Sequence, residues 1–128
     1  MKIEHLAIWV KDLEAMKRFY CQQFDFKAGE RYHNSKRGFS SYFLSGEEGA
    51  RLELMQQDDV EDASGPRGKR LGLAHIAISV GSEKAVDQLT EKLRSAGVKI
   101  LGEPRRTGDG YYESVIEDPE GNWVELTV

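Results

Sequence analysis

Alternating hydrophobic and polar residues predict that a β-strand opens the chain. Residues 3–10 are rich in branched side chains, and successive side chains of a strand point to opposite faces. One face then holds the apolar residues and the other face holds the residues between them: Leu6, Ile8 and Val10 against His5, Ala7 and Trp9. Apolar residues next recur at helical spacing, which predicts a helix over residues 13–23 with Asp12 as its N-cap. Strand-like runs follow at residues 26–32, 39–45 and 51–55.

The same order of elements is predicted a second time. Residues 73–80 form a strand pattern, and Ser82 is a candidate N-cap for a helix that Gly97 ends. Three more strand-like runs follow, at residues 98–101, 111–117 and 123–128. The stretch between the halves, residues 57–72, is polar and rich in glycine, so we predict a flexible linker there.

Matching phrases at both ends of each half support a duplicated unit. "HLAIWV" at 5–10 corresponds to "HIAISV" at 75–80, and "RLELM" at 51–55 corresponds to "WVELT" at 123–127. The fold class predicted is therefore α+β, built from two βαβββ modules over about residues 1–56 and 73–128. We expect the two modules to form a single domain over residues 1–128.

The repeated phrases place four polar side chains on the sheet faces that the helices leave uncovered. These are two histidines and two glutamates: His5, Glu53, His75 and Glu125. If the uncovered faces form a cup, the four side chains converge into a ligand set for a divalent transition metal such as nickel, cobalt or zinc. No thiolate takes part, which favours a catalytic site over a structural zinc site. His33 has no counterpart in the second half, and no role is predicted for it.

Composition and charge exclude several classes of partner. The net charge is −4 and no basic block is present, so a nucleic-acid partner is not expected. No apolar run is long enough to span a bilayer, and no membrane partner is expected. The single cysteine, Cys21, cannot form an internal disulfide and is expected to pack half-buried on the first helix. We therefore expect a cytoplasmic protein.

At these residues the chain resembles the vicinal-oxygen-chelate superfamily, which includes glyoxalase I, bleomycin-resistance proteins and extradiol dioxygenases. The resemblance spans nearly the whole chain and depends on five phrases: "HLAIWV", "FYCQQFDF", "RLELM", "GLAHIAISV" and "DPEGNWVEL". It implies two βαβββ modules whose sheets form a metal-holding cup. Small bacterial glyoxalase I has the ligand order His, Glu, His, Glu, which this chain matches. Such glyoxalases are homodimers, so His5 and Glu53 of one chain would share a metal with His75 and Glu125 of the other.

Two departures from the small glyoxalases put the thiol cosubstrate in question. Trp9 stands where those enzymes have an arginine for the glutathione carboxylate, and Met55 is followed by two glutamines where an asparagine is usual. Arg51, Arg105 and Arg106 are alternative anion-binding residues, although two arginines in a surface loop are more often solvated. Strand parity, together with the resemblance, gives an expected small-molecule pocket: Trp9, Arg51, Met55, Ser79 and Trp123.

The reaction that the resemblance implies is that of a metal-dependent lyase or isomerase. A 2-oxoaldehyde–thiol adduct would undergo proton transfer through an enediolate that a metal stabilises, with Glu125 as the base and Glu53 as its partner. One alternative is an acyl-thioester epimerase, which returns the proton to the same carbon. A second alternative is a metal-free protein that sequesters an aromatic molecule between Trp9, Tyr111, Tyr112 and Trp123.

Overall fold

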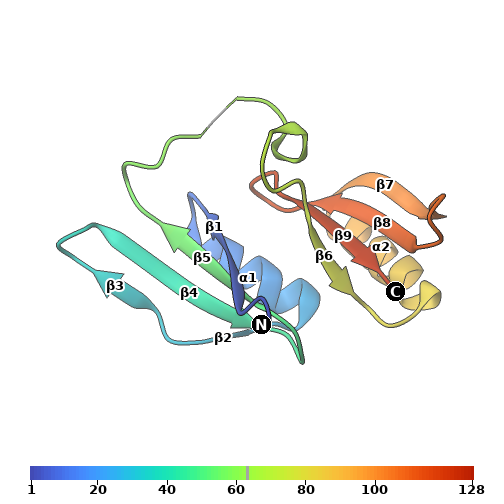
Figure 1. Cartoon of the computed structure of the whole chain (residues 1–128), viewed down its shortest axis with the longest axis horizontal. Coiled ribbons are helices and arrows are strands. Elements are labelled where there is room, and N and C mark those ends of the chain that lie inside the picture. Colours follow the sequence, from blue (N-terminus) through green and yellow to red (C-terminus); the bar gives the residue numbers. More distant parts are fainter. Residues whose placement is uncertain (63) are drawn as a thin grey trace. The chain divides into compact units, whose positions relative to one another are not determined.

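The computed structural model describes residues 1–62 and 64–128, which divide into two compact units. We call them the N-terminal unit (Met1–Ala63) and the C-terminal unit (Ser64–Val128). Each unit has one α-helix and one mixed sheet (Figure 1). The fold is therefore of the α+β class, as the sequence predicts. Neither helix in the described part of the chain is long and apolar enough to cross a membrane.

The N-terminal unit has the predicted strand–helix–strands order. Its elements are β1 (His5–Trp9), α1 (Leu13–Phe24), β2 (Lys27–Ala28), β3 (Tyr32–Asn34), β4 (Phe39–Ser45) and β5 (Arg51–Gln56). The strands form a sheet of order β1-β5-β4-β2, with β3 also paired to β4. β1 runs parallel to β5, whereas β4 and β5 are antiparallel. The first and last strands of the unit therefore lie next to each other.

The C-terminal unit repeats this topology. A short 3₁₀ helix, η1 (Arg67–Lys69), precedes the repeated elements: β6 (Ile76–Ser79), α2 (Glu83–Ser95), β7 (Lys99–Arg106), β8 (Tyr112–Glu117) and β9 (Trp123–Thr127). Their sheet has the order β6-β9-β8-β7, with β6 parallel to β9. The first strand again lies beside the last one, so the structure confirms the two βαβββ modules, with β3 as an additional short strand in the first.

Both helices begin at the predicted N-caps. The Asp12 carboxylate accepts a hydrogen bond from the Ala15 backbone N–H at 2.9 Å, and the Ser82 hydroxyl accepts one from the Ala85 N–H at 3.2 Å. Each bond satisfies one of the amide groups that a first helical turn leaves without a partner. α2 ends before Gly97, whose positive φ of 82° suits a residue without a side chain.

Each helix packs its apolar stripe on one face of its own sheet. Leu13, Met16 and Tyr20 of α1 are buried, as are Val86 and Leu93 of α2. The alternate residues of the sheets complete the two cores: Ile8, Leu44, Leu52 and Leu54 in the N-terminal unit, and Ile116, Val124 and Leu126 in the C-terminal unit. The other face of each sheet is left to the residues of opposite parity.

Several strand boundaries differ from the prediction, and three of these differences change the local arrangement. The run 26–32 contains β2 and only the first residue of β3, and the two are separate strands because their pairings with β4 are out of register by one residue. His75 lies directly before β6 rather than inside it. β7 continues past Leu101 to Arg106, although Pro104 interrupts the pattern, because β7 is an edge strand and the pairing shifts around Gly102. Arg105 and Arg106 thus lie in a strand, and the expectation of a loop is wrong.

Candidate functional site

Strand pairing gives the two histidine–glutamate pairs the same setting. In the N-terminal unit Glu53 of β5 lies between Ala7 of β1 and Phe43 of β4. In the C-terminal unit Glu125 of β9 lies between Ala77 of β6 and Val115 of β8. Each histidine stands two residues before the alanine, on the same strand face and diagonal to the glutamate. Histidine and glutamate therefore lie on the same sheet face in both units, as strand parity predicts.

The N-terminal pair is formed by His5 and Glu53. Nε2 of His5 lies 3.7 Å from Oε2 of Glu53. The glutamate side chain is only 14% exposed, whereas that of the histidine is 39% exposed. The carboxylate is thus set into the sheet surface with the imidazole at its rim, and both donors face the side that α1 does not cover.

The C-terminal pair has nearly the same geometry. Nε2 of His75 lies 3.5 Å from Oε2 of Glu125, and the glutamate is again the more buried partner, at 17% against 45%. Burial raises the pKa of Glu125, the negative charge of nearby Glu113 raises it further, and His75 acts in the opposite direction. A carboxylate with a raised pKa is a stronger base than an ordinary surface glutamate.

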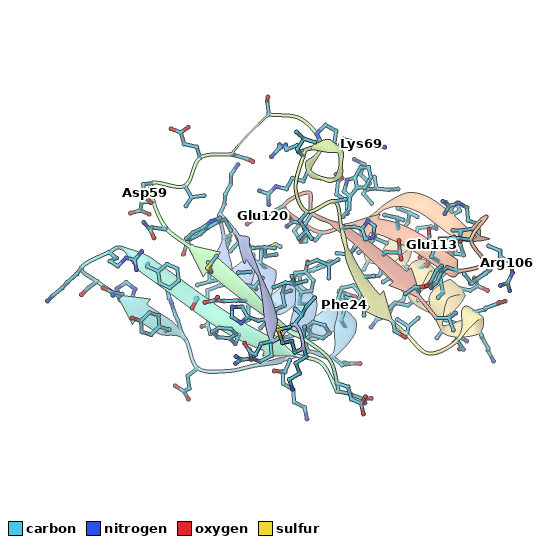
Figure 2. All side chains as sticks on the ribbon, in the orientation of Figure 1. Phe24, Asp59, Lys69, Arg106, Glu113 and Glu120 are labelled. Atoms are coloured by element: carbon cyan, nitrogen blue, oxygen red, sulfur yellow. The ribbon has the colours of Figure 1, made fainter. Side chains whose placement is uncertain are left out.

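Glu113 is a site neighbour that the sequence reasoning missed. It stands on β8 (Figure 2), opposite Thr127 and on the face that holds Glu125. Its carboxylate lies 3.4 Å from a guanidinium nitrogen of Arg105. The signal was available, because the run 111–117 was predicted as a strand and Glu113 has the parity of Val115. In the N-terminal unit the equivalent position on β4, opposite Met55, is Ser41.

The three arginines considered for anion binding all have acidic partners. Arg51 forms an ion pair with Glu4, Arg105 one with Glu113, and Arg106 one with Glu83. Arg51 also lies over the ring of Phe43, with its guanidinium carbon 4.2 Å from the ring centroid. Since each guanidinium is already neutralised, none of the three is a ready-made substitute for the missing glutathione-binding arginine.

The N-terminal pocket residues belong to an aromatic surface. Trp9 is 40% exposed and meets Phe39 edge to face, with the ring centroids 6.1 Å apart. Tyr32 contacts the same phenylalanine at 6.0 Å. Met55, paired with Trp9 in the sheet, is half-buried and continues this surface toward Glu53. We call Trp9, Tyr32, Phe39 and Met55 the aromatic patch.

The C-terminal pocket residues differ from that arrangement. Ser79, at the position equivalent to Trp9, is exposed on β6. Trp123 is half-buried because η1 packs against it: a side chain added at Gly68 would lie 2.1 Å from the indole ring, and the Lys69 ammonium lies 5.5 Å from the ring centroid. Arg67 secures this contact by donating a hydrogen bond to Asn122 at 2.9 Å. One side of Trp123 is thus covered by the chain itself.

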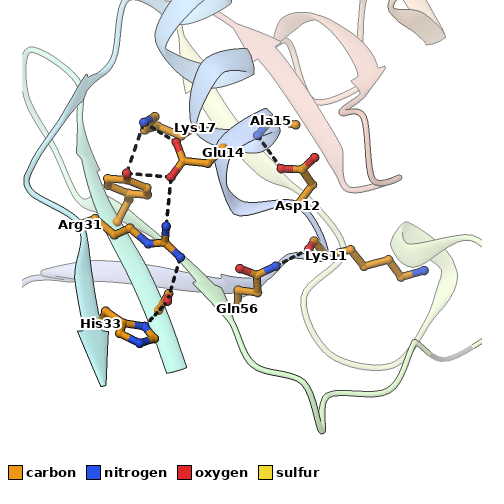
Figure 3. A network of polar contacts seen from close by, with 10 residues as sticks. Lys11, Asp12, Glu14, Ala15, Lys17, Arg31, His33 and Gln56 are labelled. Carbon is orange, nitrogen blue, oxygen red and sulfur yellow. Dashed lines mark hydrogen bonds and ion pairs between the residues drawn. The ribbon is translucent and has the colours of Figure 1, made fainter. Parts of the chain in front are cut away.

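A polar network on the helix side of the N-terminal unit accounts for His33. Nδ1 of His33 lies 2.9 Å from the buried Ser40 hydroxyl, to which Arg31 also donates a hydrogen bond (Figure 3). Glu14 joins the network through Arg31, Lys17 and Tyr42. Those contacts hold the pKa of Glu14 below its ordinary value, chiefly through the hydrogen bond from Lys17. We assign the network to the attachment of α1 on β4.

Each unit brings together two potential metal ligands. Among residues 1–62 and 64–128, no cluster of three or more His, Cys, Asp or Glu side chains is arranged to hold a metal ion. One imidazole nitrogen and one carboxylate are too few for a typical catalytic site, which has three protein ligands or more, and they are half of the four-residue ligand set expected from the sequence. Considered by itself, each unit therefore offers half a ligand set.

Comparison with known proteins shows the family to which the chain belongs. The sequence model of the "Glyoxalase/Bleomycin resistance protein/Dioxygenase superfamily" matches residues 2–126. The chain belongs to this superfamily. The Bacillus subtilis protein YqjT, which is uncharacterized, is 30% identical over 130 residues, covering 97% of this chain and 96% of the relative. The expected family resemblance is confirmed.

Solved structures of the superfamily have the same fold. A glyoxalase/bleomycin resistance protein/dioxygenase domain from Frankia has a TM-score of 0.84 at 22% identity, covering 100% of this chain and 97% of its own. Glyoxalase I from Leishmania major, whose structure is described as that of a trypanothione-dependent enzyme, has a TM-score of 0.78 at 25% identity, covering 99% and 86%. The superfamily includes glyoxalase I enzymes, so membership gives this chain an enzymatic precedent at family level.

Proposed function

We propose that this chain is a metal-dependent lyase or isomerase of the glyoxalase I type. One observation carries the proposal: each βαβββ unit brings one histidine nitrogen and one glutamate oxygen together, at 3.7 and 3.5 Å, on the uncovered face of its sheet. If the two pairs had only a structural role, they would not need the same diagonal arrangement of histidine and glutamate in both units. The proposal takes the two units as modules of one vicinal-oxygen-chelate domain over residues 1–128.

The donor chemistry of the two pairs fits a divalent metal. Two imidazoles and two carboxylates suit nickel, cobalt or zinc, and the set contains no thiolate of the kind that closes structural zinc sites. The residues that would hold the ion are His5, Glu53, His75 and Glu125. A bound divalent ion would act as a Lewis acid toward the oxygens of a substrate. Because neither unit has enough ligands, the proposed centre takes one pair from an N-terminal unit and one from a C-terminal unit.

The proposed reaction is proton transfer within a 2-oxoaldehyde–thiol adduct. Glu125 removes the proton from the carbon beside the carbonyl and returns it to the neighbouring carbon, and Glu53 is its partner. The partial burial of Glu125 beside Glu113 supports the choice of this carboxylate. The residues proposed to contact the substrate are Trp9, Arg51, Met55, Ser79 and Trp123.

We propose that the thiol of the adduct does not require the arginine contact that glutathione has in the small glyoxalases. Trp9 replaces the arginine of the small glyoxalases, and Arg51, Arg105 and Arg106 are engaged with glutamates. The similar glyoxalase I of Leishmania major is described as dependent on another thiol, trypanothione. Assays should therefore offer methylglyoxal with several thiols. We further propose a cytoplasmic location, which the single, half-buried Cys21 supports.

The aromatic patch supports a second candidate function. Trp9, Tyr32, Phe39 and Met55 form a partly exposed apolar surface beside His5 and Glu53, a suitable wall for an aromatic ligand. A protein that only sequesters such a ligand needs no metal. Elemental analysis of freshly purified protein, followed by activity assays with nickel, cobalt or zinc restored to stripped protein, distinguishes the two. Stoichiometric metal with metal-dependent turnover supports the enzyme, and tight ligand binding by metal-free protein supports sequestration.

We propose a homodimer in which the two pairs of one metal centre come from different chains. Glu53→Gln and Glu125→Gln single variants should each be inactive, because each breaks one ligand pair at every site. When the two variants are mixed and allowed to exchange subunits, half of the sites in a mixed dimer regain all four native ligands. A random mixture should then recover about a quarter of the wild-type activity.

The mixing experiment has a clear contrary result. If the variants are inactive alone and exchange subunits, but the mixture stays inactive, the pairs of one site come from the same chain and the shared-site arrangement is wrong. Full turnover by the Glu125→Gln variant alone removes Glu125 as the base. A mixture of wild type with Glu48→Gln serves as the control for the exchange treatment. Glu48 lies in an exposed turn away from both pairs, so this mixture should keep full activity.

A further inference from the structure

The carboxylate of Glu4 connects two side chains of the N-terminal site. Oε2 of Glu4 lies 2.5 Å from Nδ1 of His5, the ring nitrogen that faces away from Glu53. Oε1 of Glu4 accepts a hydrogen bond from Nε of Arg51 at 2.7 Å and a second contact from the same guanidinium. Both oxygens of Glu4 are therefore in use, one for the imidazole and one for the arginine.

The Phe43 ring contacts both partners of Glu4, the side chains of His5 and Arg51. The His5 ring meets the Phe43 ring edge to face, with centroids 5.2 Å apart, and the Arg51 guanidinium lies over the same ring. Phe43 stands opposite Glu53 in the sheet, so its position is fixed by the β4–β5 pairing. The imidazole of His5 is thus restrained at three points: by Glu4 at Nδ1, by the Phe43 ring, and by Glu53 near Nε2.

The contact with Glu4 determines which nitrogen of His5 carries the proton. An ionised carboxylate only accepts hydrogen bonds, so Nδ1 must be the donor. In a neutral imidazole the free electron pair is then on Nε2, the nitrogen 3.7 Å from Glu53. Histidines that bind metals typically donate their other N–H to a carboxylate or carbonyl, which fixes both tautomer and ring orientation.

The C-terminal unit lacks this arrangement and so provides an internal reference. The residue before His75 is Ala74, and the residue equivalent to Arg51 is Trp123. In the part of the chain that the structure describes, the His75 ring has one polar side-chain partner, Glu125. Both histidines contact a glutamate through Nε2, but among the described residues only His5 has a carboxylate, that of Glu4, at Nδ1.

We propose that Glu4 is a positioning residue for His5: it selects the Nδ1–H tautomer and directs Nε2 toward Glu53, with Arg51 anchoring Glu4. The metal-binding consequence rests on the proposed function, whereas the tautomer does not. Loss of Glu4 should release the His5 ring without altering the ring of His75. It should also weaken metal binding by about 10- to 100-fold, the usual effect of removing such a carboxylate.

The experiment measures the histidine tautomers of the full chain by long-range ¹H–¹⁵N NMR, at a pH where the imidazoles are neutral. In the wild type, His5 should be protonated at Nδ1, with Nε2 as the acceptor-type nitrogen. In a Glu4→Ala variant the His5 signals should move toward the other tautomer while those of His75 stay unchanged. Glu48→Ala, a change to an exposed glutamate of the same unit, is the matched control and should leave both rings unchanged.

A Co²⁺ titration followed by visible absorption gives a second measurement on the same variants. A weaker Co²⁺ affinity in Glu4→Ala than in Glu48→Ala agrees with the proposal. The proposal is overturned if wild-type His5 is protonated at Nε2, if Glu4→Ala leaves the His5 signals in place, or if Co²⁺ binds both variants equally well. If the wild type binds no Co²⁺, the proposed function fails, and the NMR result alone decides the role of Glu4.

Discussion

The turn before β9 depends on one buried carboxylate, and its removal should destabilise the C-terminal unit. Asp118 is only 4% exposed. One of its oxygens accepts hydrogen bonds from the backbone N–H groups of Glu120 and Asn122, at 3.0 and 2.9 Å, and the other accepts one from the Asn122 side chain at 2.7 Å. Asn122 in turn accepts the hydrogen bond from Arg67, so the turn also anchors η1.

The expected cost of Asp118→Ala follows from these bonds. A hydrogen bond to a charged group contributes about 1.5–3 kcal/mol, and three bonds to one carboxylate are not additive. We therefore expect a loss of about 3 kcal/mol in the free energy of unfolding. For a chain of this size the midpoint of thermal unfolding should fall by roughly 12 °C. Asp118→Asn keeps one oxygen acceptor for the two backbone groups and should lose less.

Urea unfolding followed by far-UV circular dichroism and by tryptophan fluorescence measures this loss. If the units unfold in separate transitions, the change belongs to the one reported by Trp123, which directly follows the turn. Asp59→Ala is the matched control, because Asp59 is an exposed acceptor for Gln57, and a change within about 0.5 kcal/mol is expected there. Equal stability of the Asp118→Ala and Asp59→Ala variants would refute the reasoning.

Three further predictions concern the packing of the helices and of η1. Thr90→Val should cost about 1–3 kcal/mol in chemical denaturation, because it leaves the buried Ser114 hydroxyl without its 2.7 Å partner, and adding Ser114→Ala should recover much of that loss. Gly68→Ala should displace η1 and increase the acrylamide quenching of Trp123, a result that unchanged quenching contradicts. The pKa of Glu14 is lowered by folding, so its contacts stabilise the protein above the ordinary value of 4.5 and lose that effect as pH falls through the folded value. The stability difference between wild type and Glu14→Gln should therefore shrink in acid, and a constant difference would contradict this account.

Strand parity was the part of the candidate site that sequence could predict. Once residues 3–10 and 51–55 were read as strands, the period of two placed His5 and Glu53 on the same face, and the structure has them 3.7 Å apart. Strand parity over residues 111–117 also places Glu113 on this face. A comparison of the two halves does not single out Glu113, because the equivalent residue in the first half is Ser41.

The role of Glu4 had no comparable signal in the sequence. Immediate neighbours in a strand point to opposite faces, so a strand pattern separates Glu4 from His5. In the structure β1 begins at His5, and Glu4 precedes it, where strand alternation no longer applies. Its carboxylate can therefore reach the imidazole beside it and the guanidinium of Arg51. Only coordinates reveal a contact of this kind, because it depends on where the strand begins.

The prediction of where β7 ends failed for a different physical reason. Gly102 and Pro104 are poor residues for a central strand, so the pattern predicted an end at Leu101. An edge strand needs hydrogen bonds on one side only, and shifts in the β7–β8 register accommodate both residues. Edge position is a property of the assembled sheet, which a local window of sequence does not contain.

The two units share the histidine–glutamate geometry but differ in the side chains around it, and this difference bears on specificity. Register alone sets the diagonal between histidine and glutamate, because in both units the glutamate pairs with the alanine two residues after the histidine. The neighbouring positions have different side chains in the two units: Arg51 against Trp123, Phe43 against Val115, Ser41 against Glu113, and Trp9 against Ser79. Substitutions there leave the backbone pairing in place. If the proposed function is correct, changes at Trp9 or Ser79 should alter which thiol adduct is accepted before they alter metal binding, whereas changes at Arg51 or Phe43 also remove a restraint on His5.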